Sequence, residues 1–102
     1  SFTASGNVTA YSDARVKENI VTIDNALEKT LALRGVYYNR TDIEDKSQNT
    51  GVIAQEIQQI LPQVVSEDSN GMLSVAYGNI VGILIEAIKE LKAEIDELKS
   101  QK

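Results

Sequence analysis

The chain has 102 residues, a formal net charge of −5, a hydrophobic fraction of 42% and a charged fraction of 25%, which is ordinary for one small folded domain. The acidic balance argues against a nucleic-acid groove or an anionic membrane surface as partner, because both attract clustered Lys and Arg. The sequence contains no histidine and no cysteine, which excludes a disulfide framework and metal sites with imidazole or thiolate ligands, so we expect no metal and no cofactor. It also has no apolar stretch long enough for a membrane-spanning helix.

The N-terminal segment, residues 1–11, is rich in Thr, Ser and other residues that favour β-structure. We expect it to be the end of an upstream β-structured region, with a turn at Gly6-Asn7. Residues 12–79 are predicted to form the body of the domain, and residues 80–102 to form a C-terminal oligomerisation helix.

A first helix is predicted over residues 25–34. Asp24 is the expected N-cap, and Gly35 stands at the expected C-terminal stop. The apolar stripe of this helix comprises Ala26, Leu27, Thr30 and Leu31. The β-propensity of residues 36–41 predicts a strand, and the polar run 42–50 predicts a loop.

Residues 51–61 are expected to begin as a strand or turn and to become a short helix. One face of this helix carries Ile53, Ile57, Ile60 and Leu61 at helical spacing. Pro62 is expected to end it. Residues 64–65 and 73–75 are predicted to be short strands of a hairpin, because an Asn-Gly pair at 70–71 is a strong turn signal.

From Tyr77 onward the sequence predicts one long helix. Its heptad stripe comprises Val81, Ile88 and Ile95 at a, and Leu84, Leu91 and Leu98 at d. Glu94 and Lys99 have the spacing of an interchain pair. The stripe covers about two and a half heptads, so alone it would be marginal. Its a and d residues favour a dimer in an isolated coiled coil, whereas the body of the domain can impose another number of chains. The sequence therefore allows both a dimer and a trimer.

Acyl chemistry has few routes in a chain without histidine. Ser12 followed five residues later by Lys17 is one of them, because a neutral lysine can act as the base for a serine nucleophile. Burial against Val16 and Ile20 is expected to lower the pKa of Lys17. This spacing matches neither one helix face nor one strand face, so the backbone must turn between the two residues or they must meet across chains. The alternative is an N-cap serine and a solvated lysine.

The chain resembles the C-terminal intramolecular chaperone and auto-processing domain of phage tailspikes and tail fibres, which are endosialidase-type self-cleaving serine peptidases. The order and spacing of the matching segments make the resemblance specific. These segments are Ser12–Ile20, Asn25–Leu27 with Leu33–Val36, Gly51–Glu56, Leu61–Val65 and Leu73–Tyr77.

This resemblance implies an α+β body that ends in a trimeric helical bundle or coiled coil. It implies a homotrimer that brings the upstream fibre or tailspike region into register and then releases itself by single-turnover cleavage with a Ser12–Lys17 dyad. The family usually cuts between the equivalents of Ser12 and Asp13. The domain would act in the host cytoplasm during virion assembly and be absent from the mature virion.

The scissile bond stays open on chemical grounds. Attack of Ser12 on the Tyr11 carbonyl forms a five-membered ring, whereas attack on its own carbonyl forms a strained four-membered ring. The Ser12–Asp13 cut is therefore easier to understand if the serine of a neighbouring chain attacks. Asp13 either positions the cleavage site or is a turn residue. The sequence does not identify the oxyanion donors that the reaction requires.

Gln55 and Glu56 are candidate supporting residues that could orient the lysine or donate to the oxyanion, although such a pair more often lies on a solvated helix surface. Two alternative functions remain. One is a non-enzymatic trimerisation domain, and the other is the equivalent self-cleaving domain of a membrane-bound transcription factor.

Overall fold

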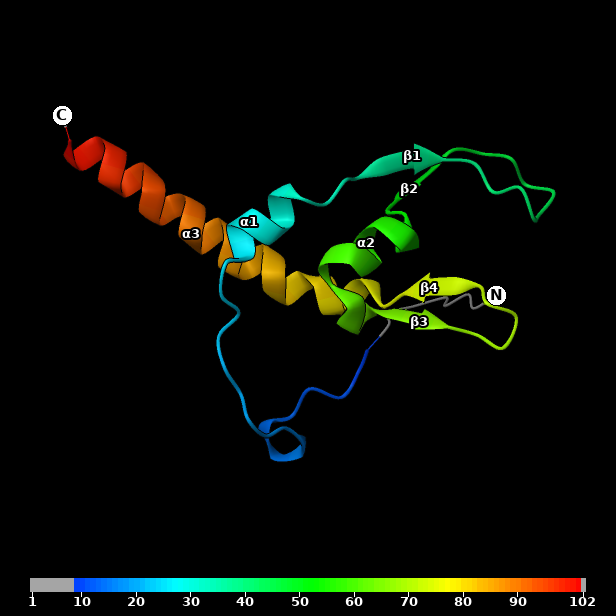
Figure 1. Cartoon of the computed structure of the whole chain (residues 1–102), viewed down its shortest axis with the longest axis horizontal. Coiled ribbons are helices and arrows are strands. Elements are labelled where there is room, and N and C mark those ends of the chain that lie inside the picture. Colours follow the sequence, from blue (N-terminus) through cyan, green and yellow to red (C-terminus); the bar gives the residue numbers. More distant parts are fainter. Residues whose placement is uncertain (1–8, 102) are drawn as a thin grey trace.

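A computed structural model describes residues 9–101 of the chain. The predicted turn at Gly6-Asn7 and most of the expected β-structured segment lie outside the described residues. The α+β class is confirmed, because short helices and two antiparallel hairpins precede a long C-terminal helix (Figure 1). The elements are α1 (Ala26–Leu31), β1 (Val36–Tyr38), β2 (Asn49–Gly51), α2 (Ala54–Ile60), β3 (Val65–Glu67), β4 (Leu73–Val75) and α3 (Val81–Ser100), with 3₁₀ turns at Ala14–Val16, Pro62–Val64 and Tyr77–Ile80.

The core lies where α1 and α2 pack against the first half of α3. Its buried side chains are Ala26, Ile57, Val64, Ile80, Ile83 and Ala87. The far end of α3 extends beyond the other elements (Figure 1). The radius of gyration is 17.1 Å, whereas a compact domain of about 100 residues has about 13 Å. A single chain therefore buries little of its apolar surface.

The two hairpins flank α2. Strands β1 and β2 pair antiparallel, with Tyr37 opposite Thr50. The loop predicted over 42–50 therefore ends earlier than expected, because residues 49 and 50 belong to β2. Strands β3 and β4 form the expected second hairpin. Gly71 has φ 82° in its connection, a left-handed conformation that glycine adopts without steric cost. The Asn-Gly turn signal is thereby confirmed.

Residue Pro62 ends α2, as expected, because the helix stops at Ile60 and Pro62 opens a 3₁₀ turn. The helix predicted from Tyr77 is also confirmed, although its first turn is 3₁₀ and the α-helical part begins at Val81. These elements follow their local sequence signals closely.

The first helix differs from its prediction at both ends. It spans Ala26–Leu31 and ends well before Gly35. Asp24 is not its N-cap: Asn25 occupies that position in a left-handed conformation, with φ 51°, and makes no side-chain cap hydrogen bond. The cap instead comes from Glu90 of α3, whose carboxylate accepts hydrogen bonds from the backbone N–H groups of Ala26 at 2.8 Å and Leu27 at 3.1 Å. A carboxylate at a helix N-terminus satisfies donors that have no partner within the helix.

Replacing Glu90 with alanine is expected to lower the free energy of unfolding by about 1–2 kcal/mol, since it removes charge-assisted bonds to two partly buried N–H groups. Urea denaturation at fixed protein concentration measures the effect. Glu97→Ala is the matched control, because it removes an exposed carboxylate farther along α3. Equal midpoints for the two variants would show that the cap contributes nothing.

The heptad stripe of α3 is exposed in the single chain. Its six side chains are between 41% and 67% exposed, while Ile83 and Ala87 on the neighbouring face are buried against the body. One long helix therefore presents two apolar faces, one covered by its own chain and one without cover among residues 9–101.

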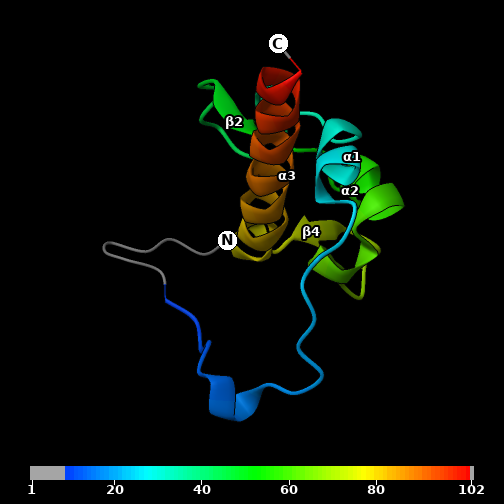
Figure 2. The same ribbon diagram turned by 90° about the vertical axis from the view of Figure 1, so that its left-hand side faces the viewer.

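The segment that leads into α1 has little regular structure. Residues 9–25 are exposed, and their only helical element is the 3₁₀ turn Ala14–Val16. Figure 2 shows the 3₁₀ turn in blue, standing away from α1, α2 and α3, whereas the end of the segment runs up to α1 and lines a cavity with Val64 and Ile83. Asn19 has φ 55°, which redirects the chain between the turn and the extended run that follows.

Candidate active site

The structure brings Ser12 and Lys17 together within one chain. The Nζ atom of Lys17 donates a hydrogen bond of 2.7 Å to the Oγ atom of Ser12. The backbone turns between them, which was one of the two arrangements that their spacing allowed. A serine hydroxyl and a lysine amine at this distance have the geometry of a nucleophile and its base.

A short 3₁₀ turn produces this approach. The Val16 N–H donates to the Asp13 carbonyl at 3.1 Å, and the Lys17 N–H donates to the Ala14 carbonyl at 3.2 Å. Asp13 itself is extended, with φ −68° and ψ 136°, as an N-cap residue should be. The turn reverses the chain over residues 14–16 and thus directs the Lys17 side chain back to Ser12.

The dyad is open to solvent in the single chain. Ser12 and Lys17 are both exposed, and the neighbouring Val16 and Ile20 are 70% and 71% exposed. The expectation that Val16 and Ile20 bury Lys17 is therefore wrong for one chain. These side chains project from a segment that lies apart from the core, so their own chain gives them nothing to pack against within the described residues.

The carboxylate of Asp13 is held by Arg15. Its Oδ1 accepts from the Arg15 backbone N–H at 2.8 Å and from Nε at 3.0 Å, and its Oδ2 accepts from Nη2 at 2.8 Å. The side-chain hydrogen bond from Arg15 is the main cause that lowers the pKa of Asp13 below its usual 3.8. Arg15 was not among the candidate residues from the sequence, although an acidic and a basic residue two positions apart beside a turn could have indicated it.

The structure does not join the candidate supporting residues to the dyad. Glu56 lies on α2, where its carboxylate accepts hydrogen bonds from Arg34 at 3.1 Å from Nε and 2.6 Å from Nη2. The side-chain hydrogen bond from Arg34 lowers the pKa of Glu56. Gln55 lines a cavity of about 850 Å³ between the two hairpins. In Figure 1 the blue turn lies well apart from α2.

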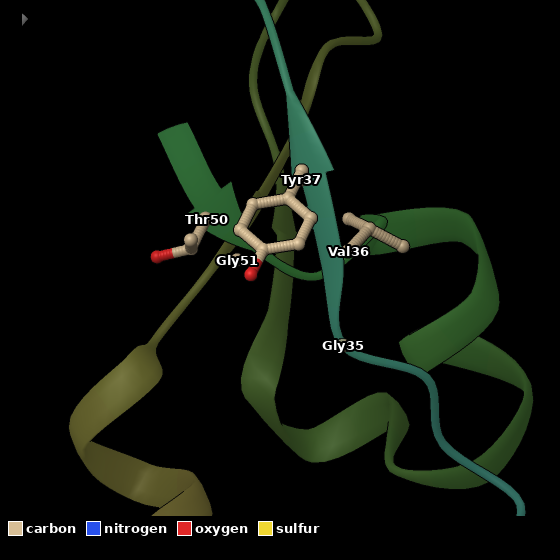
Figure 3. A pocket seen from close by; sticks show the side chains of 5 residues that line it. All are labelled: Gly35, Val36, Tyr37, Thr50 and Gly51. Carbon is tan, nitrogen blue, oxygen red and sulfur yellow. The ribbon is translucent and has the colours of Figure 1, made fainter. Parts of the chain in front are cut away.

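A smaller hollow, of about 300 Å³, lies at the base of the β1–β2 hairpin (Figure 3). The ring of Tyr37 from β1 lies beside Thr50 and Gly51 of β2, and Gly35 and Val36 complete the lining. This lining has no carboxylate, lysine or arginine, so it offers no acid–base pair. Among residues 9–101 there is also no group of three acidic side chains that could hold a metal ion, and no helix with the length and hydropathy to cross a membrane.

Comparison with known proteins gives consistent results. A model of the family described as chaperone of endosialidase matches residues 12–66. The long tail fiber proteins Gp37 of Enterobacteria phage K3 and Enterobacteria phage T2 are each 38% identical over 102 residues, which covers 93% of this chain and 8% of the relative. Gp37 of Enterobacteria phage Ox2 is 36% identical over 102 residues, which covers 92% of this chain and 41% of the relative. The chain thus spans 8% of the length of the first two relatives.

Proposed function

Because this chain belongs to the chaperone of endosialidase family, we propose that it is the intramolecular chaperone of a phage tail fibre and that it releases itself by serine-type self-cleavage. The observation that carries the proposal is the hydrogen bond of 2.7 Å between Lys17 and Ser12, at the start of the segment that the family model matches. The relatives named as long tail fiber proteins support the fibre as the upstream region, in preference to a membrane-bound transcription factor.

Three segments of the chain have separate roles in this proposal. Residues 1–11 are the end of the fibre stalk, residues 12–79 are the chaperone and auto-protease body, and residues 80–102 assemble three copies. Assembly places three stalk ends in register, so that pairing of the three stalks becomes intramolecular and avoids repeated association of separate chains. The released domain stays in the host cytoplasm and is absent from the mature virion.

The chemical step uses Lys17 in its neutral form. The Ser12 hydroxyl donates its proton to Nζ while Oγ attacks the Ser12 carbonyl carbon of a neighbouring chain, which avoids the strained four-membered ring. The carbon–nitrogen bond then breaks, the lysine proton passes to the leaving amine, and an ester remains on the serine. Water hydrolyses this ester, so the step needs no cofactor.

Assembly is the proposed source of the missing burial. A neutral lysine is favoured where charged groups are desolvated, whereas Lys17 is exposed in one chain. The exposed apolar side chains Val16 and Ile20, beside the dyad, are suited to packing on a neighbouring copy. Cleavage then begins only when the three chains have assembled, so it occurs only in trimers whose chains are in the correct register.

Two observations favour a second candidate function, a non-enzymatic trimerisation domain. The Asp13 side chain caps its turn and Lys17 is solvated, as a purely structural role would have it. The two functions differ in one simple respect: only the first produces a fragment from the wild-type chain.

Expression with a longer upstream segment tests the proposal. We expect two bands on a denaturing gel, and mass spectrometry of the smaller product should give an N-terminal Asp13, as the family placement of the cut requires. An N-terminal Ser12 would instead show cleavage after Tyr11 through the five-membered ring. A wild-type chain that stays whole under conditions in which it trimerises would favour the trimerisation domain.

A further inference from the structure

The turn between Ser12 and Lys17 is closed by bonds that lie within the segment itself. Among residues 9–101, the side-chain hydrogen bonds of residues 12–17 comprise the Lys17–Ser12 bond and the three bonds from Arg15 to the Asp13 carboxylate. The body contributes none of them. In a single chain, the order of this turn therefore depends on local contacts alone.

The Asp13 carboxylate serves two purposes in this turn. Its Oδ1 caps the backbone N–H of Arg15, which fixes the start of the 3₁₀ turn. The guanidinium of Arg15 donates hydrogen bonds to both carboxylate oxygens. This bidentate geometry restricts rotation of both side chains. The side-chain hydrogen bonds of Arg15 all go to Asp13, so Arg15 acts on the dyad only through the turn.

We propose that Asp13 and Arg15 form a clamp that positions the Ser12–Lys17 dyad for self-cleavage. This inference rests on the proposed function. The clamp keeps residues 13–16 in the conformation that returns Nζ of Lys17 to within hydrogen-bond distance of Oγ of Ser12. Arg15 is a positioning residue, because its guanidinium contacts neither reacting atom. Without the clamp the turn samples more conformations, and the fraction that holds the dyad falls.

Self-cleavage rates of the chain with its upstream segment test the clamp. Arg15→Ala leaves the scissile residues and the backbone cap unchanged and removes the exposed ion pair, so it is expected to slow cleavage about twofold to fivefold. Asp13→Ala, which removes cap and ion pair together, should be slower still. Asp13→Asn retains an oxygen for the cap but not the ion pair, so it should recover part of the rate lost in Asp13→Ala.

The chain offers a matched control. Arg40 and Asp42 form the same kind of exposed pair two residues apart, with an Nε–Oδ1 distance of 2.7 Å, in the loop between β1 and β2. This loop lies far from the blue turn in Figure 1. Arg40→Ala should cleave at the wild-type rate. Thermal midpoints of all variants separate loss of positioning from loss of folding, and they should match within experimental error because Arg15 is 89% exposed.

Failure of the clamp and failure of the proposed function give different results. If the wild type cuts and Lys17 is required, but Arg15→Ala cuts as fast as wild type, the clamp is wrong and the dyad stands. Equal slowing by Arg15→Ala and Arg40→Ala would also overturn the clamp, because the effect would then follow net charge. A wild-type chain that never cuts removes the proposed function itself.

Discussion

Replacing Lys17 with alanine is expected to slow self-cleavage by about 10²- to 10⁴-fold, the range associated with loss of a general base. The proton of the Ser12 hydroxyl then has no acceptor, because the Lys17 amine is the group that lies 2.7 Å from Oγ. The trimer should still form, since Lys17 is exposed and lies outside the core. Gel densitometry over time measures the cut fraction, and light scattering after size exclusion measures the assembly.

Three further variants sharpen this result. Ser12→Ala should be blocked as strongly, because the nucleophile is missing. Lys17→Arg should also be blocked, since a guanidinium stays protonated and cannot accept the proton. Lys89→Ala removes another exposed lysine, from α3, and should cut normally. A Lys17→Ala chain that still cuts would remove lysine from the mechanism, and a Ser12→Ala chain that still cuts would remove the serine.

Replacing Ile88 with aspartate is expected to abolish both assembly and cleavage. Ile88 is 67% exposed in the single chain, so the body should tolerate the change. At the centre of a helical bundle the same change places one unpaired carboxylate per chain in an apolar seam, at a cost of several kcal/mol for each. The product should be a folded monomer by sedimentation, with circular dichroism of a helical protein and no cleaved fragment.

The control for this change lies one turn farther on. Ala93 is exposed on the outer face of α3, so Ala93→Asp introduces the same charge away from the stripe and should remain trimeric and active. A trimeric Ile88→Asp chain would show that the stripe is not the interface. A monomeric Ile88→Asp chain that still cuts would break the proposed link between assembly and cleavage. A dimeric wild type would match the isolated heptad preference instead.

Elements with strong local signals were predictable from the sequence. Helix α2 with its Pro62 stop, the β3–β4 hairpin and the long helix α3 all follow from patterns within their own residues. The sequence places the first two residues of β2 in a loop, because Asn49 and Gly51 disfavour strands and the segment is ordered by pairing with β1. The cap of α1 was assigned to Asp24, because nothing near the helix indicates an acceptor 64 residues away on α3.

In the candidate site too, features set by neighbouring residues were predictable, and features set by distant surfaces were not. The close approach of Ser12 and Lys17 was among the arrangements foreseen, since it depends on one short turn. Burial of Lys17 was predicted wrongly for the single chain, because desolvation depends on surfaces that adjacent sequence does not supply. The spacing of Asp13 and Arg15 hints at an ion pair, but its effect on the dyad depends on the conformation of the turn, which the spacing does not specify.

The exposed run between Lys17 and α1 has a kinetic consequence. Residues 18–25 form a tether with no regular helix or strand, anchored at α1 by the Glu90 cap. Eight residues reach roughly 26 Å when extended, at about 3.3 Å each. In the proposed trimer, such a tether would hold the reactive turn near the neighbouring chains at a local concentration on the order of millimolar. We expect docking of the turn within that trimer to be unimolecular, so that dilution of the sample leaves its rate unchanged.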